Sequence, residues 1–175
     1  MTEDRKQKLI DLSNEILADA LLELAVHSKV ADDLIERLIV TPKENTKRFE
    51  KKLSSLKHSR QFIDWRSVSG FAIELEMLLQ DLKSGVSDPL TGVEQVAAFY
   101  EADNTIFKMS DDSSGNIGDV FRYDAKELFV GYASRCAEKE KIADIILKVN
   151  QNDNYGIRDT LIDCAAEFLD RKSVV

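Results

Sequence analysis

Apolar residues recur at helical spacing along most of this 175-residue chain. The clearest case is the segment from Phe62 to Leu82, where Ala72 and Met77 widen an apolar stripe beyond what a helix with one solvated face would carry. We therefore predict a helix at the centre of the core, with Trp65 closing one end of that core and Gly85 ending the helix in a left-handed conformation. The stripe consists of Val68, Phe71, Leu75, Leu78, Leu79 and Leu82.

Capping residues divide the rest of the chain into further helices. Thr41, Pro42 and Glu44 have the spacing of a capping box, in which the threonine is the N-cap and the glutamate bonds back to it. The apolar stripe from Leu9 to Leu24 is predicted to face inward on a helical stretch over residues 3–26. Other apolar stripes predict helices over residues 88–107, 116–136, 140–150 and 157–169. Ser28 and Asp88 suit N-caps, and Ser13 indicates a break in the first stretch.

These segments predict an all-α protein of about eight helices paired as antiparallel hairpins. Two prolines and seven glycines in the whole sequence favour helices over a turn-rich β architecture. We expect one domain over residues 1–175, in which the hairpins stack as a short α-solenoid of tetratricopeptide or HEAT type, or close into a helical bundle. No tetratricopeptide or ankyrin consensus recurs at a fixed period.

Composition narrows the cellular context. The net charge of −8 disfavours a general affinity for nucleic acid or an anionic membrane. No apolar run approaches the roughly 18 residues of a membrane span, and the charged N-terminus has no apolar signal region. Cys136 and Cys164 lie far apart in apolar helical patterns, which is typical of reduced thiols. We therefore expect a cytoplasmic protein without membrane contact.

Positive charge is concentrated between Thr41 and Arg66, where eight basic residues stand against three acidic ones. Several of the basic residues repeat every three or four positions, so a helix there presents a basic face. The face is either a solvated outer surface or a binding site. As a site it would contact an acidic protein partner or, less favoured because no aromatic residue lies among these positions, a nucleic-acid backbone. The candidate partner-binding residues are Lys43, Lys47, Arg48, Lys51, Lys52 and Arg60.

The loop from Ser110 to Asp119 is the second candidate site. It partly matches a calcium-binding EF-hand loop, but its twelfth position is Phe121, where such a loop needs a bidentate glutamate. In the structural interpretation, Asp112 or Asn116 caps the following helix. A further hypothesis is an enzyme whose site forms around this loop only in three dimensions. The candidate residues are Asp111, Asp112, Asn116 and Asp119.

The histidines and cysteines predict no metal site, because His27, His58, Cys136 and Cys164 share no short spacing. No catalytic constellation is evident, so we expect no enzymatic activity, cofactor or metal. The favoured function is a protein-interaction module with an unidentified protein partner. The apolar edges that a solenoid exposes are also compatible with a homodimer.

Three segments resemble a known family. They are LLELA at Leu21–Ala25, FID at Phe62–Asp64, and DDSSGNIGD at Asp111–Asp119 before a long helix. Together they are similar to a bacterial helical domain of unknown function that often follows a SWIM-type zinc finger. The resemblance spans roughly residues 21–168 and implies a helical-repeat interaction module without catalytic residues. The chain has no paired Cys-x-Cys and Cys-x-His ligands for the finger itself.

Overall fold

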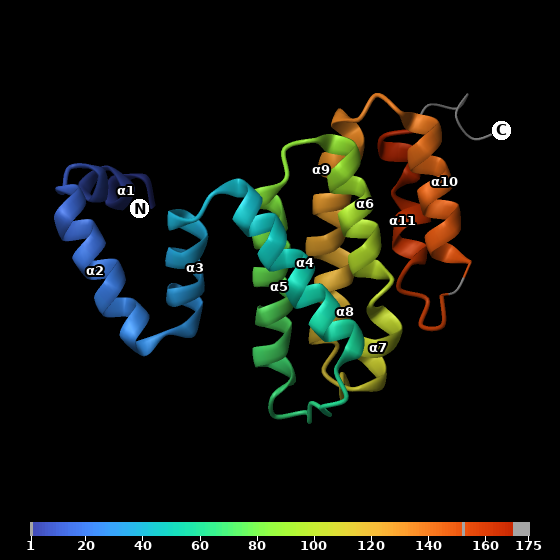
Figure 1. The fold of residues 1–175 in the computed structure, drawn as a ribbon, viewed down its shortest axis with the longest axis horizontal. Coiled ribbons are helices and arrows are strands. Elements are labelled where there is room, and N and C mark those ends of the chain that lie inside the picture. The colour runs from blue at the N-terminus through green and yellow to red at the C-terminus, as the bar shows by residue number, and fades with distance from the viewer. Residues whose placement is uncertain (1, 152, 170–175) are drawn as a thin grey trace. The chain divides into compact units, whose positions relative to one another are not determined.

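The computed structural model describes residues 2–151 and 153–169, and the chain divides into two compact units, Met1–Val40 and Thr41–Val175. Each unit is described by itself. Both are helical, and Figure 1 shows no strand in the described ranges. Among the described residues, the only β-type contact is an isolated bridge between Ile63 and Ser110, both in the second unit. The all-α prediction is confirmed.

The first unit consists of α1 (Thr2–Ile10), α2 (Asn14–His27) and α3 (Lys29–Ile39), with α2 and α3 packed together. The break predicted at Ser13 is confirmed, since its Oγ accepts the first-turn N–H of Ile16 at 3.3 Å. Ser28 caps α3 in the same way, with Oγ 3.3 Å from the amide nitrogen of Ala31.

The inward-facing stripe predicted for this unit is wrong for most of its residues, although Leu17 and Leu21 are partly buried. Leu9, Ile16 and Leu24 are each more than half exposed, and α2 contains no buried residue. Three short helices bring too little surface together to cover an apolar stripe of that length.

The second unit begins with the predicted capping box. Thr41 Oγ1 accepts the Glu44 N–H, and Glu44 Oε2 accepts the Thr41 hydroxyl at 2.7 Å and the Thr41 N–H at 2.8 Å. The hydrogen bond from the hydroxyl, followed by that from the N–H, lowers the pKa of Glu44. The helices are α4 (Pro42–His58), α5 (Val68–Gly85), α6 (Pro89–Tyr100), α7 (Asp103–Lys108), α8 (Asn116–Asp119), the π-helix Val120–Ala125, α9 (Lys126–Arg135), α10 (Lys139–Asn150), α11 (Asp159–Asp163) and the 3₁₀ turn Ala165–Glu167.

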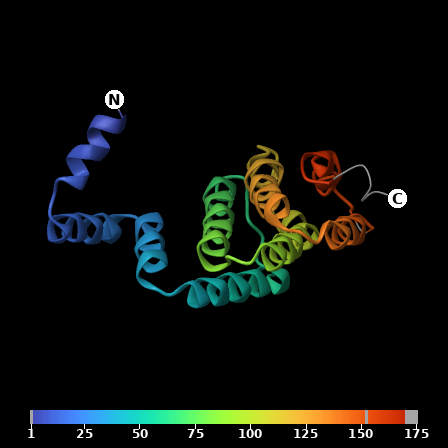
Figure 2. The same cartoon turned by 90° about the horizontal axis from the view of Figure 1, so that it is seen from above.

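These helices lie in two layers. Figure 2 shows α4, α6 and α10 in one layer, with α5, α9 and α11 in the other. Helix α8, the π-helix and α9 follow one another without a break from residue 116 to 135. Helix α5 contacts α4, α6, α8 and the π-helix.

The central position of α5 is confirmed, because it is covered on more than one side. Its buried residues are Val68, Phe71, Ala72, Leu75, Met77, Leu78, Leu79, Asp81 and Leu82. Of these, only Asp81 is charged.

Two details predicted for the ends of α5 are wrong. Trp65 does not close the core, because the helix begins after it at Val68 and its side chain is 62% exposed. Gly85 does not adopt a left-handed conformation, since the described residues with positive φ are Gly115 and Gly156. A Cβ at Gly85 would lie 2.6 Å from the backbone nitrogen of Thr46, so the glycine permits the first turn of α4 to approach.

Two predicted helices are shorter than expected. The helix expected over residues 88–107 ends at Tyr100, and α7 starts again at Asp103. The helix expected over residues 157–169 is divided between α11 and the 3₁₀ turn. The first break places the carboxylate of Asp103 inside the protein, where it meets Arg158.

Asp103 and Arg158 form a buried ion pair between α7 and the segment before α11. Arg158 Nη2 and Nε donate to the two oxygens of Asp103 at 2.6 and 2.8 Å. Arg158 Nη1 donates to the carbonyl of Val149 at 2.7 Å. The hydrogen bond to Asp103 raises the pKa of Arg158. This pair therefore joins the segment before α11 to α7.

We expect Arg158→Leu to lower the free energy of unfolding by about 3–5 kcal/mol, because it leaves the Asp103 carboxylate buried without its cation. The double variant Asp103→Leu/Arg158→Leu should recover much of this loss, since no buried charge remains. Urea unfolding of the three proteins measures both effects. Equal losses in the single and double variants would contradict this assignment.

We also expect Gly92→Ala to destabilise the protein by about 1–3 kcal/mol, because the added Cβ would overlap the ring of buried Tyr132. Gly131→Ala is the matched control. Its Cβ would meet nothing within 4 Å, and alanine favours the helix by about 1 kcal/mol. Thermal unfolding should shift in opposite directions for the two variants.

Candidate interaction surface

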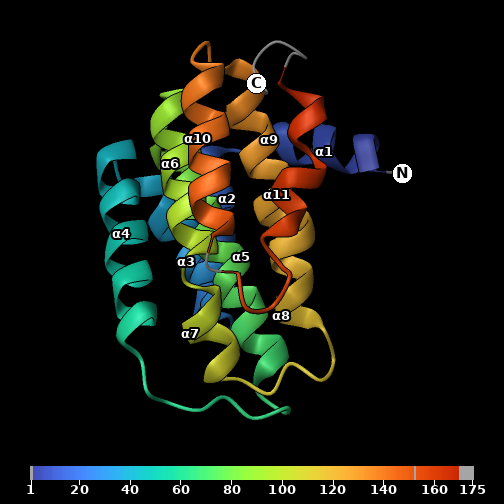
Figure 3. The same ribbon diagram turned by 90° about the vertical axis from the view of Figure 1, so that its right-hand side faces the viewer.

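Two loops meet at one end of the second unit, and the second of them overlaps the candidate loop Ser110–Asp119. They are the loop of residues 59–67, between α4 and α5, and the loop of residues 109–115, between α7 and α8 (Figure 3). The Ile63 N–H donates to the Met109 carbonyl at 2.7 Å, and the Asp111 N–H donates to the Ile63 carbonyl at 2.9 Å. We call residues 59–67 and 108–116 the two-loop end, which includes the last residue of α7 and the first residue of α8.

The first of these loops holds two aromatic residues in solvent. Ile63 packs against the core, whereas Phe62 before it is 63% exposed. Neighbouring side chains of an extended segment point to opposite sides, so anchoring Ile63 turns Phe62 outward. Asp64 Oδ1 then accepts the N–H groups of Arg66 and Ser67, each at 3.0 Å, in the turn that carries exposed Trp65.

The second loop is organised by its aspartates. Asp112 accepts the N–H groups of Ile117 and Gly118 at 2.9 Å, one with each carboxylate oxygen. Of the two capping residues that the sequence left open, Asp112 therefore supplies the acceptors, although the N-cap position itself is Gly115. Asn116 instead donates through Nδ2 to Ser69 Oγ at 2.8 Å, which joins α8 to α5.

The other two residues predicted for this loop are Asp111 and Asp119. Asp111 Oδ1 accepts the Ser113 N–H at 3.2 Å, and Asp119 is exposed. In the described part of the chain, no group of three or more His, Cys, Asp or Glu residues could hold a metal ion. Of the four predicted residues, Asp111 and Asp112 thus accept backbone N–H groups, Asn116 contacts Ser69, and Asp119 is exposed.

The predicted basic face is divided between two roles. Lys52 Nζ and Arg48 Nε lie 3.2 and 3.7 Å from a carboxylate oxygen of Asp81, which is fully buried on α5. Lys43, Lys47 and Lys51 are exposed on α4, and Arg60 lies in the two-loop end. The signal for the Asp81 contacts was an aspartate within the apolar stripe of α5.

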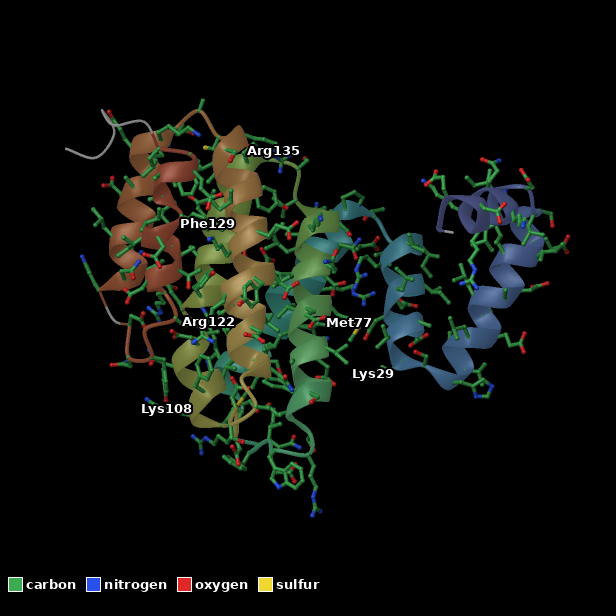
Figure 4. All side chains as sticks on the ribbon, turned by 180° about the vertical axis from the view of Figure 1, so that it is seen from behind. Lys29, Met77, Lys108, Arg122, Phe129 and Arg135 are labelled. Atoms are coloured by element: carbon green, nitrogen blue, oxygen red, sulfur yellow. The ribbon has the colours of Figure 1, made fainter. Side chains whose placement is uncertain are left out.

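A groove of about 820 Å³ lies between the C-terminal half of α5 and the helix from residue 124 to 135. Tyr132, whose hydroxyl donates to the Val86 carbonyl at 2.9 Å, lies at its base with the Arg135 guanidinium 5.1 Å from the ring centre. Burial raises the pKa of Tyr132. Figure 4 places Arg135 at the end of α9 away from Lys108 and the two-loop end.

The charges around this groove are mixed. Its lining includes Lys83 and Arg135 as well as Asp124 and Glu127. Burial, reinforced by Glu127, raises the pKa of Asp124, and burial with nearby Asp124 raises that of Glu76. Because both signs of charge are present, the charges of the groove do not point to one class of ligand. Sequence reasoning missed it because its walls come from distant segments.

The exposed aromatic pair was also missed. Trp65 was assigned to the core, although Asp64 before it has the sequence character of an N-cap and could have indicated that the helix starts later. An apolar stripe alone does not show whether a tryptophan near its start is buried in the core or exposed in the turn before the helix.

A family model matches residues 4–175, and its description is a family of unknown function, DUF6880. The chain belongs to this family. The match says nothing of a SWIM-type finger or of a bacterial source, so those expectations for this DUF6880 member stay predictions. Neither the curated proteins nor the solved structures contain a match to the chain. Within the described residues, no helix is both long and apolar enough to cross a membrane.

We expect Asp112→Ala to cost about 1 kcal/mol of unfolding free energy, the usual effect of removing a helix cap. The amides of Ile117 and Gly118 should exchange faster with solvent, because they lose their acceptor. Asp119→Ala removes the same charge from an exposed position and should change stability by less than about 0.5 kcal/mol. Unchanged exchange at both amides in Asp112→Ala would contradict the capping assignment.

Proposed function

We propose that this protein is a protein-interaction module that binds a partner through the two-loop end. The observation that carries the proposal is the exposure of Phe62 and Trp65, at 63% and 62%, on a loop attached to the core. Tryptophan and arginine are enriched among the residues that dominate binding energy in protein interfaces. Here Arg66 lies beside Trp65, with its guanidinium carbon 5.2 Å from the ring centre.

The attachment of the loop supports this function. Backbone hydrogen bonds on both sides of Ile63 and two more to Asp64 hold the loop in place before any partner arrives. A pre-ordered loop loses less conformational entropy on binding, so more of the contact energy appears as affinity. Single exposed apolar residues are ordinary, but a fixed aromatic pair is a suitable anchor for a partner.

The alternative functions receive less support from the same geometry. Two of the six proposed basic contacts, Arg48 and Lys52, lie against buried Asp81, which leaves fewer cations for a nucleic-acid backbone. The carboxylates of Asp111 and Asp112 accept backbone N–H groups, which disfavours a catalytic role for them. A cytoplasmic location and action without a cofactor complete the proposal.

We expect Phe62→Ala/Trp65→Ala to abolish capture of a discrete partner protein from nuclease-treated native lysate. Loss of an aromatic anchor typically weakens binding about tenfold or more. Leu147→Ala/Ile162→Ala is the matched control, since both of its side chains are large, apolar and at least half exposed on other helices. Quantitative mass spectrometry of the three captures gives the comparison.

The proposal fails if all three proteins capture the same set in equal amounts. Capture that depends on nucleic acid, tested with a parallel untreated lysate, would favour the nucleic-acid alternative. Circular dichroism of the variants shows whether they remain folded, which their surface positions lead us to expect.

A further inference from the structure

The carboxylates of the two-loop end accept hydrogen bonds from backbone amides of the same loops or of the start of α8. Asp64 accepts two backbone N–H groups, Asp112 accepts two, and Asp111 accepts one. Hydrogen bonds from backbone amides stabilise a carboxylate and reduce its availability to an outside cation. The carboxylates keep their charge, so an acidic ligand must place its own charges opposite the cations of this surface and away from the aspartates.

The cations of the same surface remain open to solvent. Arg60, Arg66 and Lys108 are exposed, and none of the three forms an ion pair with any residue that the structure describes. Figure 4 places Lys108 at this end of α7. The guanidinium of Arg66 stacks over Trp65, which leaves its N–H groups directed to solvent or to a ligand.

We propose that the two-loop end binds an acidic segment of a partner protein. Carboxylates of that segment would meet Arg60, Arg66 and Lys108, while its apolar side chains pack on Phe62 and Trp65. Arginine suits this role because its planar fork can donate two parallel hydrogen bonds to one carboxylate. The inference rests on the proposed function and adds the chemical class of the partner.

Charge geometry favours a peptide over a nucleic acid at this surface. A nucleic-acid strand carries charge at regular short intervals, so some phosphates would lie beside the aspartates of the two loops. A peptide can place its acidic residues only opposite the cations. The two aromatic side chains could stack on bases, which makes single-stranded DNA the necessary comparison.

The test is fluorescence anisotropy with a labelled synthetic peptide that alternates glutamate with leucine and phenylalanine. A second peptide with glutamine in place of glutamate, and an oligothymidylate of the same formal charge, are the comparison ligands. The glutamate peptide should bind the full chain about tenfold or more tightly than either of them. Binding should weaken at higher salt, since exposed charges are screened.

Protein variants then localise the binding. Arg60→Glu/Arg66→Glu should weaken the glutamate peptide about tenfold or more, and Trp65→Ala should weaken both peptides. Lys83→Glu/Lys148→Glu changes the net charge equally at exposed positions on α5 and α10, and should leave binding within about twofold. This control separates recognition at the two-loop end from a general effect of charge.

Several outcomes overturn the inference. They are equal binding of the glutamate and glutamine peptides, equal loss in both charge-reversed proteins, and tighter binding of oligothymidylate that depends on Trp65. A fourth is self-association of the wild type, seen by sedimentation and lost in Arg60→Glu/Arg66→Glu, without peptide binding. If a captured partner requires Phe62 and Trp65 but tolerates Arg60→Glu/Arg66→Glu, the interaction function stands and the acidic partner is wrong.

Discussion

The packing of α4 on α5 depends on one buried carboxylate. Asp81 is fully buried on the central helix, where a lone charge would be strongly unfavourable. Lys52 and Arg48 reach the same oxygen of Asp81 from α4. Because these two cations lie one helical turn apart, they can meet a single carboxylate only when α4 has one particular position along α5. Burial of hydrophobic residues holds α4 against α5, and the Asp81 carboxylate fixes the position of α4 along α5.

The same arrangement recurs further along the chain, where buried Asp103 is held by Arg158. Each pair joins segments that are distant in sequence, and in each a cation compensates an acid inside the fold. Basic residues of this protein therefore fall into two groups. Arg48, Lys52 and Arg158 stabilise buried acids, whereas others, such as Arg60, are exposed on the surface.

Local signals made much of the fold predictable, because a capping box or an apolar stripe is complete within a few residues. The box at Thr41 and the stripe of α5 are examples. The candidate surface was only half predictable. Arg60 and the aspartates of the second loop were named as candidates, but Arg66 and Lys108 were not. The contact between Ile63 and Asp111 joins segments that are distant in sequence. The role of Arg48 likewise depends on Asp81, and the exposure of Trp65 depends on where α5 begins. Such features require knowledge of which distant residues meet.

The π-helix makes the position of the loop of residues 109–115 depend on the number of residues between that loop and α9. Ile117, Phe121, Ala125, Phe129 and Ala133 are all buried and lie four residues apart. In a regular α-helix each step of four passes a full turn by about 40°, so the row would wind away from the core. The wider π turn at Val120–Ala125 accommodates an extra residue and reduces this drift. Loss of one residue there would rotate Ile117 by about 100° relative to α9. A change in length, even one that removes no functional side chain, would therefore turn the capped loop away from Ile63.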